Sequence, residues 1–149
     1  TGDVSAHSLN LNNNLTFAYL NLINESEITK SKIPKDILEN IQKRISKCTE
    51  FFILILFGSY AKSNATQKSD VDIAVIIEAE RTRKELTPCL ETIKRREIKT
   101  IDYHIFTRME FLEMLNAENE NMGKQILKNS IVYYGYIPYL ILIKEIKHE

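Results

Sequence analysis

Two aspartates at the start of an apolar run are the residues of this sequence best placed to do chemistry. Asp70 and Asp72 begin the segment SDVDIAVII, in which nearly every later residue is aliphatic. Alternate side chains of a strand point to the same face, so both carboxylates are expected on one side. Like charges at this spacing raise each other's pKa unless a cation lies between them. Carboxylate oxygens favour Mg²⁺ or Mn²⁺ over zinc, which makes a hard divalent ion the expected partner.

A Gly-Ser pair upstream favours metal binding over a simpler interpretation. Taken alone, the two aspartates are more typical of a solvated strand end that follows a turn. Gly58 and Ser59, however, directly follow the apolar run FFILILF, where glycine lets the backbone turn sharply and approach a ligand closely. Backbone N–H groups and the Ser59 hydroxyl could bind phosphate oxygens at this point. Because phosphates attract metal ions, the pair strengthens the metal-binding hypothesis.

A third carboxylate interrupts another predicted strand. In KTIDYHIF, Asp102 falls within an apolar alternation, and we expect this strand to pair beside the one that carries Asp70 and Asp72. Three carboxylates from two strands can bind two metal ions and orient a hydroxyl for in-line attack on phosphorus. By itself a strand aspartate is more often exposed than catalytic. His104 shares the predicted face of Asp102, and we expect it to lie beside the site without acting in it.

The elements that must position these side chains are helices and strands in mixed order. Apolar residues at helical spacing, a proline at 88 that kinks or divides its helix, and a capping box of Thr107 and Glu110 predict four helices. These helices cover residues 34–48, 82–98, 108–115 and 121–135. The predicted strands cover residues 51–57, 69–77 and 99–106. This order predicts an α/β (α+β) domain with a small mixed sheet flanked by helices.

Residues 1–30 are interpreted as an N-terminal arm before a domain over residues 31–149. The segment VSAHSLNL alternates like a short strand, NLTFAYLNLI predicts a helix capped by Asn14, and ESEITKSK predicts a polar connector. The chain begins with Thr, so we expect it to be a piece of a longer or processed product. The tail YIPYLILIKEIKHE is apolar enough to pack on the domain core or against a second subunit of a homo-oligomer, and both alternatives stay open.

Composition narrows the function classes only slightly. The formal net charge is zero, so whole-molecule electrostatics give no argument for nucleic-acid or membrane binding. No apolar run reaches the roughly 20 residues that a membrane-spanning helix needs. Cys48 and Cys89 match no metal or redox spacing, which predicts reduced thiols in a cytoplasmic protein. The basic residues within 81–99 are more typical of a solvated helix face than of a nucleic-acid surface.

The stretch FGSYAKSNATQKSDVDIAVII, with Asp102 on a later strand, resembles the polymerase-beta-type nucleotidyltransferase superfamily. It is most similar to the minimal nucleotidyltransferases, which include partners of HEPN-type toxins, and the IVYYG segment resembles the close of such domains. The resemblance covers about residues 34–136. It implies the nucleotidyltransferase fold, a nucleoside triphosphate substrate, Mg²⁺ (or Mn²⁺), and transfer of a nucleoside monophosphate to a hydroxyl with release of pyrophosphate. Within that class we expect ATP as the substrate and AMP as the transferred group. A protein hydroxyl is the expected acceptor, and a HEPN-type partner is one candidate.

The resemblance also assigns roles to single residues. Gly58 and Ser59 would bind the triphosphate. The nucleotide-binding candidates together are Gly58, Ser59, Lys62 and Ser69. The metal-binding and catalytic candidates are Asp70, Asp72 and Asp102. The first two would hold both metals, and Asp102 would hold the catalytic metal and help to deprotonate the acceptor.

One position departs from the pattern of the family. Such proteins often have glycine where Ser63 stands, after a basic residue that is matched here by Lys62. We expect Asn64 to supply the left-handed backbone conformation instead, since Asn tolerates positive φ better than most residues. Lys62 fits a phosphate contact and a solvated lysine equally well.

The rival hypothesis is a non-catalytic module, either a nucleotide-binding antitoxin or a DNA-binding regulator. The segment TGDVSAHSLNLNNNLTFAYLNLINE weakly resembles the last wing strand and following helix of a winged helix-turn-helix domain. An ordinary N-terminal arm fits it as well. These residues contain no recognition helix, so we expect DNA binding only from a longer form that carries the full domain.

Overall fold

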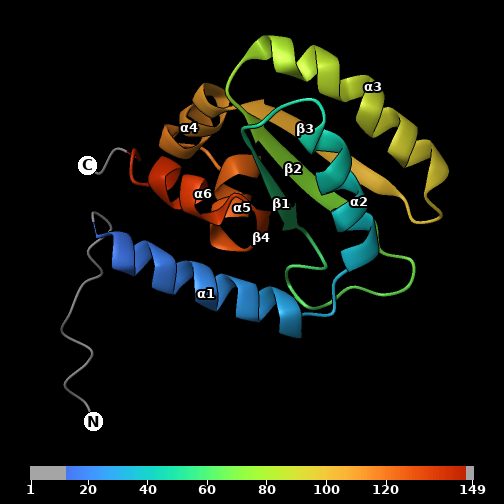
Figure 1. The fold of residues 1–149 in the computed structure, drawn as a ribbon, viewed down its shortest axis with the longest axis horizontal. Helices are drawn as coiled ribbons and strands as arrows, with labels where there is room; N and C mark the ends of the chain where they lie inside the picture. The colour runs from blue at the N-terminus through green and yellow to red at the C-terminus, as the bar shows by residue number, and fades with distance from the viewer. Residues whose placement is uncertain (1–12, 147–149) are drawn as a thin grey trace.

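The computed structural model describes residues 13–146 (Figure 1). The strand predicted within VSAHSLNL lies outside these residues. Ten elements follow one another along the chain, six helices and four strands within the described part. No helix among them is both long and apolar enough to cross a membrane.

A four-stranded mixed sheet forms the centre of the molecule, with the strand order β3-β2-β1-β4. Its strands are β1 (Phe52–Phe57), β2 (Val71–Ile77), β3 (Ile101–Thr107) and β4 (Ile131–Tyr134). β1 runs antiparallel to both β2 and β4, whereas β2 and β3 are parallel. The small mixed sheet that the sequence predicts is therefore confirmed.

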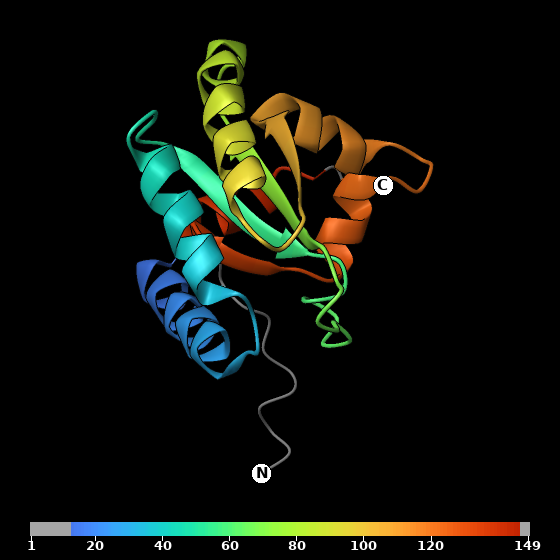
Figure 2. The ribbon, with the colours of Figure 1, turned by 90° about the vertical axis from the view of Figure 1, so that its right-hand side faces the viewer.

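Helices cover both faces of this sheet (Figures 1 and 2). They are α1 (Asn14–Lys30), α2 (Lys35–Ser46), α3 (Glu80–Arg96), α4 (Arg108–Asn116), α5 (Met122–Lys128) and α6 (Tyr136–Ile143). Buried residues of α2 and α3 pack on one face, and buried residues of α4, α5 and α6 pack on the other. Every residue of β1 is buried, which explains the unbroken apolar run FILILF.

Local sequence patterns account for the elements that were predicted correctly. In α2, Leu38, Ile41 and Ile45 recur on one stripe and are all fully buried. In front of α4, the Thr107 hydroxyl accepts a hydrogen bond from the Glu110 N–H, and the Glu110 carboxylate accepts one from the Thr107 N–H. This is the expected capping box, so the junction between β3 and α4 is encoded locally.

The helix predicted over residues 121–135 is wrong in its second half. α5 ends at Lys128, and residues 131–134 form β4, antiparallel to β1. The letters IVYY favour a strand, and pairing with β1 along the open side of the sheet decides the conformation. Gly135 then turns the chain into α6 with a φ of 83°, and a Cβ there would lie 2.9 Å from the Phe52 carbonyl oxygen. Only glycine fits such a turn without strain.

The connector predicted within ESEITKSK is also wrong, because α1 continues to Lys30. Its N-cap is Asn13 instead of Asn14, since the Asn13 side chain accepts a hydrogen bond from the Leu15 N–H at 2.8 Å. Tertiary contacts stabilise the polar second half of this helix: Ile28 is buried, and the Asn24 amide donates to the Val132 carbonyl oxygen at 2.9 Å. α1 thereby covers the outer edge of β4.

Two further expectations concern α3 and the tail. α3 is one continuous helix that contains Pro88, so the predicted division does not occur. Pro88 has no N–H group to donate to the Lys84 carbonyl oxygen four residues earlier in the helix. Both residues are exposed, so water can hydrate that carbonyl instead. In the tail, Tyr139 and Leu142 of α6 are buried in the core beside β1. The tail therefore packs on the core of its own domain.

Candidate functional site

Asp72 and Asp102 lie side by side on neighbouring strands. In the parallel pairing of β2 with β3, Asp72 stands opposite Asp102, and in the antiparallel pairing with β1 it stands opposite Phe57. Paired residues point to the same face of a sheet, so both carboxylates belong to the face covered by α4 to α6. The predicted pairing of the Asp102 strand with the Asp72 strand is confirmed.

The three aspartates differ in burial. β2 begins at Val71, so Asp70 precedes the strand and is exposed, whereas Asp72 lies within it and is half-buried. The side chain of Asp102 is 54% exposed. The strand predicted from residue 69 is therefore too long by two residues. Of the three aspartates, Asp72 is the one that loses part of its hydration in the folded protein.

The pKa of Asp72 is raised above its ordinary value. Burial is the largest cause, followed by repulsion from Asp102 and from Asp70. Among the described residues that act on this pKa, His104 alone lowers it. His104 therefore offsets the negative charge around Asp72 only in part, and a bound cation would offset the remainder.

His104 stands between the carboxylates and an aromatic layer. Its Nε2 atom is 3.4 Å from Asp102 Oδ2. The ring lies 6.1 Å from the Phe57 ring and 6.2 Å from the Phe106 ring, measured between centroids. His104 shares the face of Asp102, as the strand alternation predicts, and it limits the positions open to the Asp102 side chain.

Gly58 brings the backbone against the Asp72 carboxylate. It follows β1 directly and has a φ of 71°, in the left-handed region. A Cβ at this position would lie 2.2 Å from Asp72 Oδ2 and 3.0 Å from Asp72 Cγ. No side chain fits there, so the glycine is required both for the turn and for the close approach.

Residues 59–64 form a single helical turn that ends in a Schellman motif. The Asn64 N–H donates to the Ser59 carbonyl oxygen at 3.1 Å, and the Ser63 N–H donates to the Tyr60 carbonyl oxygen at 3.3 Å. This motif requires a left-handed residue at its penultimate position. Ser63 takes that conformation with a φ of 59°, so the expectation that Asn64 supplies it is wrong. Ser63 itself therefore takes the place where the resemblance leads us to expect a glycine.

The remaining predicted nucleotide-binding residues lie on the outer part of the loop. The Ser69 hydroxyl accepts a hydrogen bond from the Thr66 N–H at 2.8 Å, and the Ser69 N–H donates to the Thr66 carbonyl oxygen at 3.1 Å. Ser69 therefore closes a tight turn in front of Asp70. Lys62 is exposed, and its side chain makes no hydrogen bond or ion pair with another described residue. The geometry brings Gly58 and the aspartates together and leaves these two residues at the periphery.

The carboxylates suit a magnesium ion chemically. Two oxygen-donor groups are adjacent, a third is two residues away along the chain, and their mutual repulsion is offset only in part. Among the described residues, however, no three His, Cys, Asp or Glu side chains are already arranged as a metal-binding group. Asp70 and Asp102 are both exposed, and His104 lies beside Asp102, so a three-ligand site around Asp72 would need a rearrangement of these side chains.

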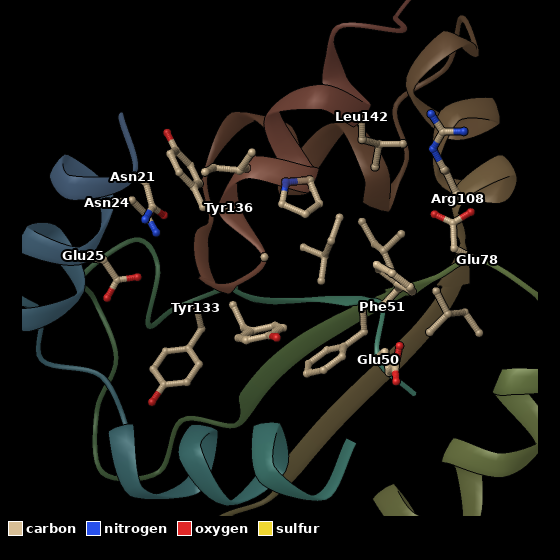
Figure 3. A pocket seen from close by; sticks show the side chains of 18 residues that line it. Asn21, Asn24, Glu25, Glu50, Phe51, Glu78, Arg108, Tyr133, Tyr136 and Leu142 are labelled. Carbon is tan, nitrogen blue, oxygen red and sulfur yellow. The ribbon is translucent and has the colours of Figure 1, made fainter. Parts of the chain in front are cut away.

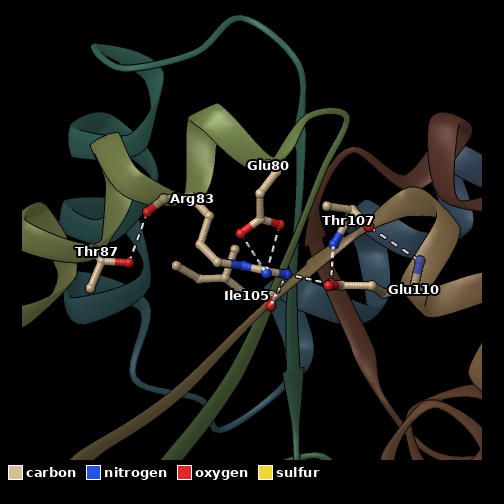
Figure 4. Close-up of polar contacts among 6 residues, drawn as sticks. All are labelled: Glu80, Arg83, Thr87, Ile105, Thr107 and Glu110. Carbon is tan, nitrogen blue, oxygen red and sulfur yellow. Dashed lines mark hydrogen bonds and ion pairs between the residues drawn. The ribbon is translucent and has the colours of Figure 1, made fainter.

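Arg83 holds the far end of β3 (Figure 4). Its Nη1 atom donates to both carboxylate oxygens of Glu80, at 2.8 and 2.7 Å, and its Nη2 atom donates to the Ile105 carbonyl oxygen at 3.2 Å and to Glu110. The Arg83 guanidinium lowers the pKa of Glu110. Sequence reasoning placed this arginine on a solvated face, and only the pairing of three elements around it reveals its structural role.

A pocket of about 490 Å³ lies at the end of the sheet that is opposite to the three aspartates (Figure 3). Residues of α1, such as Asn21 and Glu25, form one wall, and Tyr136 and Leu142 of α6 form another. It opens beside the start of β1 and the end of β2, whereas Asp72 is near the start of β2. None of the predicted site residues lines it. The carboxylates lie at the other end of the sheet, where Asp70 and Asp102 are exposed.

Comparison with known proteins gives one positive finding. The family model described as "Polymerase beta, Nucleotidyltransferase" matches residues 39–136. The match covers about two thirds of the chain and includes every residue predicted for the site. No curated protein and no solved structure matches the chain. Together with the mixed sheet, the family match confirms the expected nucleotidyltransferase fold.

Proposed function

Because the chain belongs to the polymerase beta nucleotidyltransferase family, we propose that it transfers AMP from Mg²⁺-bound ATP to a hydroxyl group. Nucleotidyl transfer in general is the chemistry of this family. The observation that supports the proposal most is the adjacency of Asp72 and Asp102 on paired strands, with the Gly58 backbone against the Asp72 carboxylate.

Each aspartate has a separate role in this proposal. Asp70 and Asp72 would hold both metal ions, and Asp102 would hold the catalytic one. Bound Mg²⁺ would stabilise the charge that develops on the phosphate oxygens and on the attacking hydroxyl. The hydroxyl oxygen bonds to the α-phosphorus as the bond to pyrophosphate breaks, and Asp102 helps to remove the hydroxyl proton. Its exposed carboxylate is accessible for that step.

The loop after β1 would bind the triphosphate. The Gly58 and Ser59 N–H groups and the Ser59 hydroxyl are the proposed donors, with Lys62 and Ser69 as peripheral contacts. Support comes from the Schellman turn, which leaves the N–H groups at its start without partners inside the turn. Oriented backbone donors of this kind form anion-binding sites.

A protein hydroxyl is the acceptor that we propose. Asp70 and Asp102 are exposed, so a side chain of another protein could reach them without entering a deep pocket. A HEPN-type partner in the cytoplasm, neutralised by AMP transfer, is the finer form of this proposal. The alternative function is a nucleotide-binding module without catalysis, and it is favoured by the absence of a preformed three-ligand group among residues 13–146.

The test combines calorimetric titration of Mg²⁺–ATP with transfer of labelled AMP to lysate proteins or a co-purified partner. Asp72→Asn should abolish transfer and weaken binding together, whereas Asp102→Asn should keep much of the affinity and lose transfer by orders of magnitude. Glu118→Gln is the matched control, since Glu118 is exposed and distant in sequence from the site. ATP binding by the wild type without any labelling would favour the non-catalytic alternative. No binding of any nucleotide would refute both.

A further inference from the structure

The loop between β1 and β2 is bonded almost entirely to itself. Residues 59–69, which we name the phosphate loop, contain the Schellman turn at one end and the Thr66 to Ser69 turn at the other. Their backbone hydrogen bonds all join residues within the loop or return to Gly58. The first bond of the following strand is that from the Val71 N–H to the Thr100 carbonyl oxygen, at 2.8 Å. Such a segment is expected to open locally unless something ties it down.

One side chain from a distant segment hydrogen-bonds to this loop, in addition to the packing of the Tyr60 ring on the core. The Lys99 Nζ atom donates to the Gln67 carbonyl oxygen at 3.2 Å. The same atom lies 5.6 Å from the centroid of the Tyr60 ring, within range of a cation–π interaction. Within residues 13–146, this is the one hydrogen bond between the phosphate loop and a segment that is not adjacent to it in the chain, since the bond of the Lys62 N–H goes to the neighbouring Gly58. Lys99 thus contacts both halves of the loop at once.

Lys99 is not the solvated lysine that the basic stretch 81–99 suggests. It is half-buried, and Tyr60, on which it rests, packs against the core cluster shared by α2 and α3. The ammonium group makes a charge-assisted hydrogen bond to Gln67 and a cation–π contact with Tyr60 at the same time, although the hydrogen bond itself is exposed to solvent. Lys94 is a useful contrast, because it lies 5.8 Å from the Tyr103 ring centroid but makes no bond to the loop.

Lys99 acts on the loop from the side opposite to the carboxylates. Tyr60 belongs to the layer of α2 and α3, whereas Asp72 and Asp102 face the layer of α4 to α6. The Lys99 side chain is therefore placed to support the loop and not to touch the triphosphate. It also lies three residues before Asp102, so one segment of chain sets both the loop and the third carboxylate.

We propose that Lys99 is a positioning residue that holds the phosphate loop in the conformation that receives the triphosphate. The role of Lys99 in nucleotide binding rests on the proposed function. The restraint of the loop by the contacts of Lys99 with Gln67 and Tyr60, which we call the tether, does not depend on it. Without Lys99, nucleotide binding has to order the loop, and the entropy of that ordering weakens affinity. Saturating nucleotide would still order the loop, so the transfer rate at saturation should change little.

The tether is tested first without any nucleotide. The loop contains Lys62 and Lys68, so limited trypsin digestion reports its opening directly. Lys99→Met should raise the cleavage rate within the loop by about 5–20-fold, the ratio expected for losing the two contacts. Lys99→Arg should restore most of the protection, because arginine can donate to the same carbonyl and stack on the same ring. Lys94→Met is the matched control and should cleave like the wild type.

The consequence for binding is tested by calorimetric titration of Mg²⁺–ATP. The Kd should rise about 5–20-fold in Lys99→Met, return toward wild type in Lys99→Arg, and stay unchanged in Lys94→Met. Wild-type cleavage of the loop in Lys99→Met would overturn the tether. Faster cleavage with an unchanged Kd would overturn the positioning role. If the wild type bound no nucleotide, the proposed function would fail, while the digestion experiment would still decide whether Lys99 restrains the loop.

Discussion

Gly58→Ala is the substitution that tests the site geometry most directly. The added Cβ would lie 2.2 Å from Asp72 Oδ2, about 1 Å inside van der Waals contact, so the carboxylate has to move by about that distance. An alanine at a φ of 71° also carries a left-handed conformation, which costs roughly 1–2 kcal/mol. With about 1 kcal/mol more for a displaced Asp72 rotamer, the expected loss of stability is about 2–3 kcal/mol.

Two measurements separate the consequences of this change. The melting temperature should fall by about 4–12 °C for a chain of this size. A displacement of about 1 Å at a metal-binding carboxylate should lower the transfer rate by about two orders of magnitude. Affinity for Mg²⁺–ATP should fall as well, because Asp72 is the most central of the proposed ligands.

Gly135→Ala is the matched control. Gly135 has a φ of 83°, and its Cβ would lie 2.9 Å from the Phe52 carbonyl oxygen, at the end of the sheet remote from Asp72. It should destabilise the fold by a similar amount and leave Mg²⁺–ATP affinity unchanged in the folded protein. In an Asp72→Ala background, the cost of Gly58→Ala should shrink to the backbone term alone. The reasoning is refuted if Gly58→Ala keeps the wild-type melting temperature and nucleotide affinity.

Three further predictions follow from the same geometry. Ser63→Gly should raise the unfolding free energy by about 1 kcal/mol, because Ser63 is the left-handed residue of the Schellman turn, and thermal melts should show no gain for Asn64→Gly. Burial and neighbouring carboxylates raise the pKa of Asp72, so the folded state binds that proton more tightly and the ionised group costs stability above the folded pKa. In EDTA at pH 7, Asp72→Asn should therefore raise the melting temperature, with a gain in unfolding free energy of under about 1 kcal/mol. The gain should vanish near about pH 3, where the protonated Asp72 of the wild type is as neutral as the asparagine of the variant. A gain that grew on acidification would contradict this. Arg83→Met should cost about 1–2 kcal/mol in denaturant titrations, since Glu80, Glu110 and the Ile105 carbonyl lose their donor, whereas breaking the exposed Lys43 pair with Glu39 should change nothing measurable.

Much of the fold could be predicted from the sequence because the signals are local. The stripe of Leu38, Ile41 and Ile45 predicts α2, and the capping box of Thr107 and Glu110 predicts the start of α4. The apolar runs predict β1 and β2, with an end error of two residues for β2. The spacing from Gly58 to Asp72 carries the candidate site, since a glycine after a buried strand permits a close approach and an aspartate inside the next strand needs a compensating partner.

Other features depend on contacts between distant residues, which no local pattern contains. Residues 131–134 are a strand because β1 offers its free edge, and the second half of α1 is helical because Asn24 and Ile28 contact the domain. The left-handed residue is Ser63, not Asn64, because the Schellman bonds place it there against the intrinsic preference.

The same division holds within the site. The sequence by itself determined which residues carry charge and which turn needs a glycine, because residue chemistry and backbone freedom are properties of single positions. The sequence also predicted that the Asp102 strand pairs with the Asp72 strand. Only the tertiary structure decided the register that places Asp102 opposite Asp72, the contact of Gly58 with the Asp72 carboxylate, and the contacts of Lys99 with the loop. Strand register and packing set those distances, and they arise only when segments far apart in the chain meet.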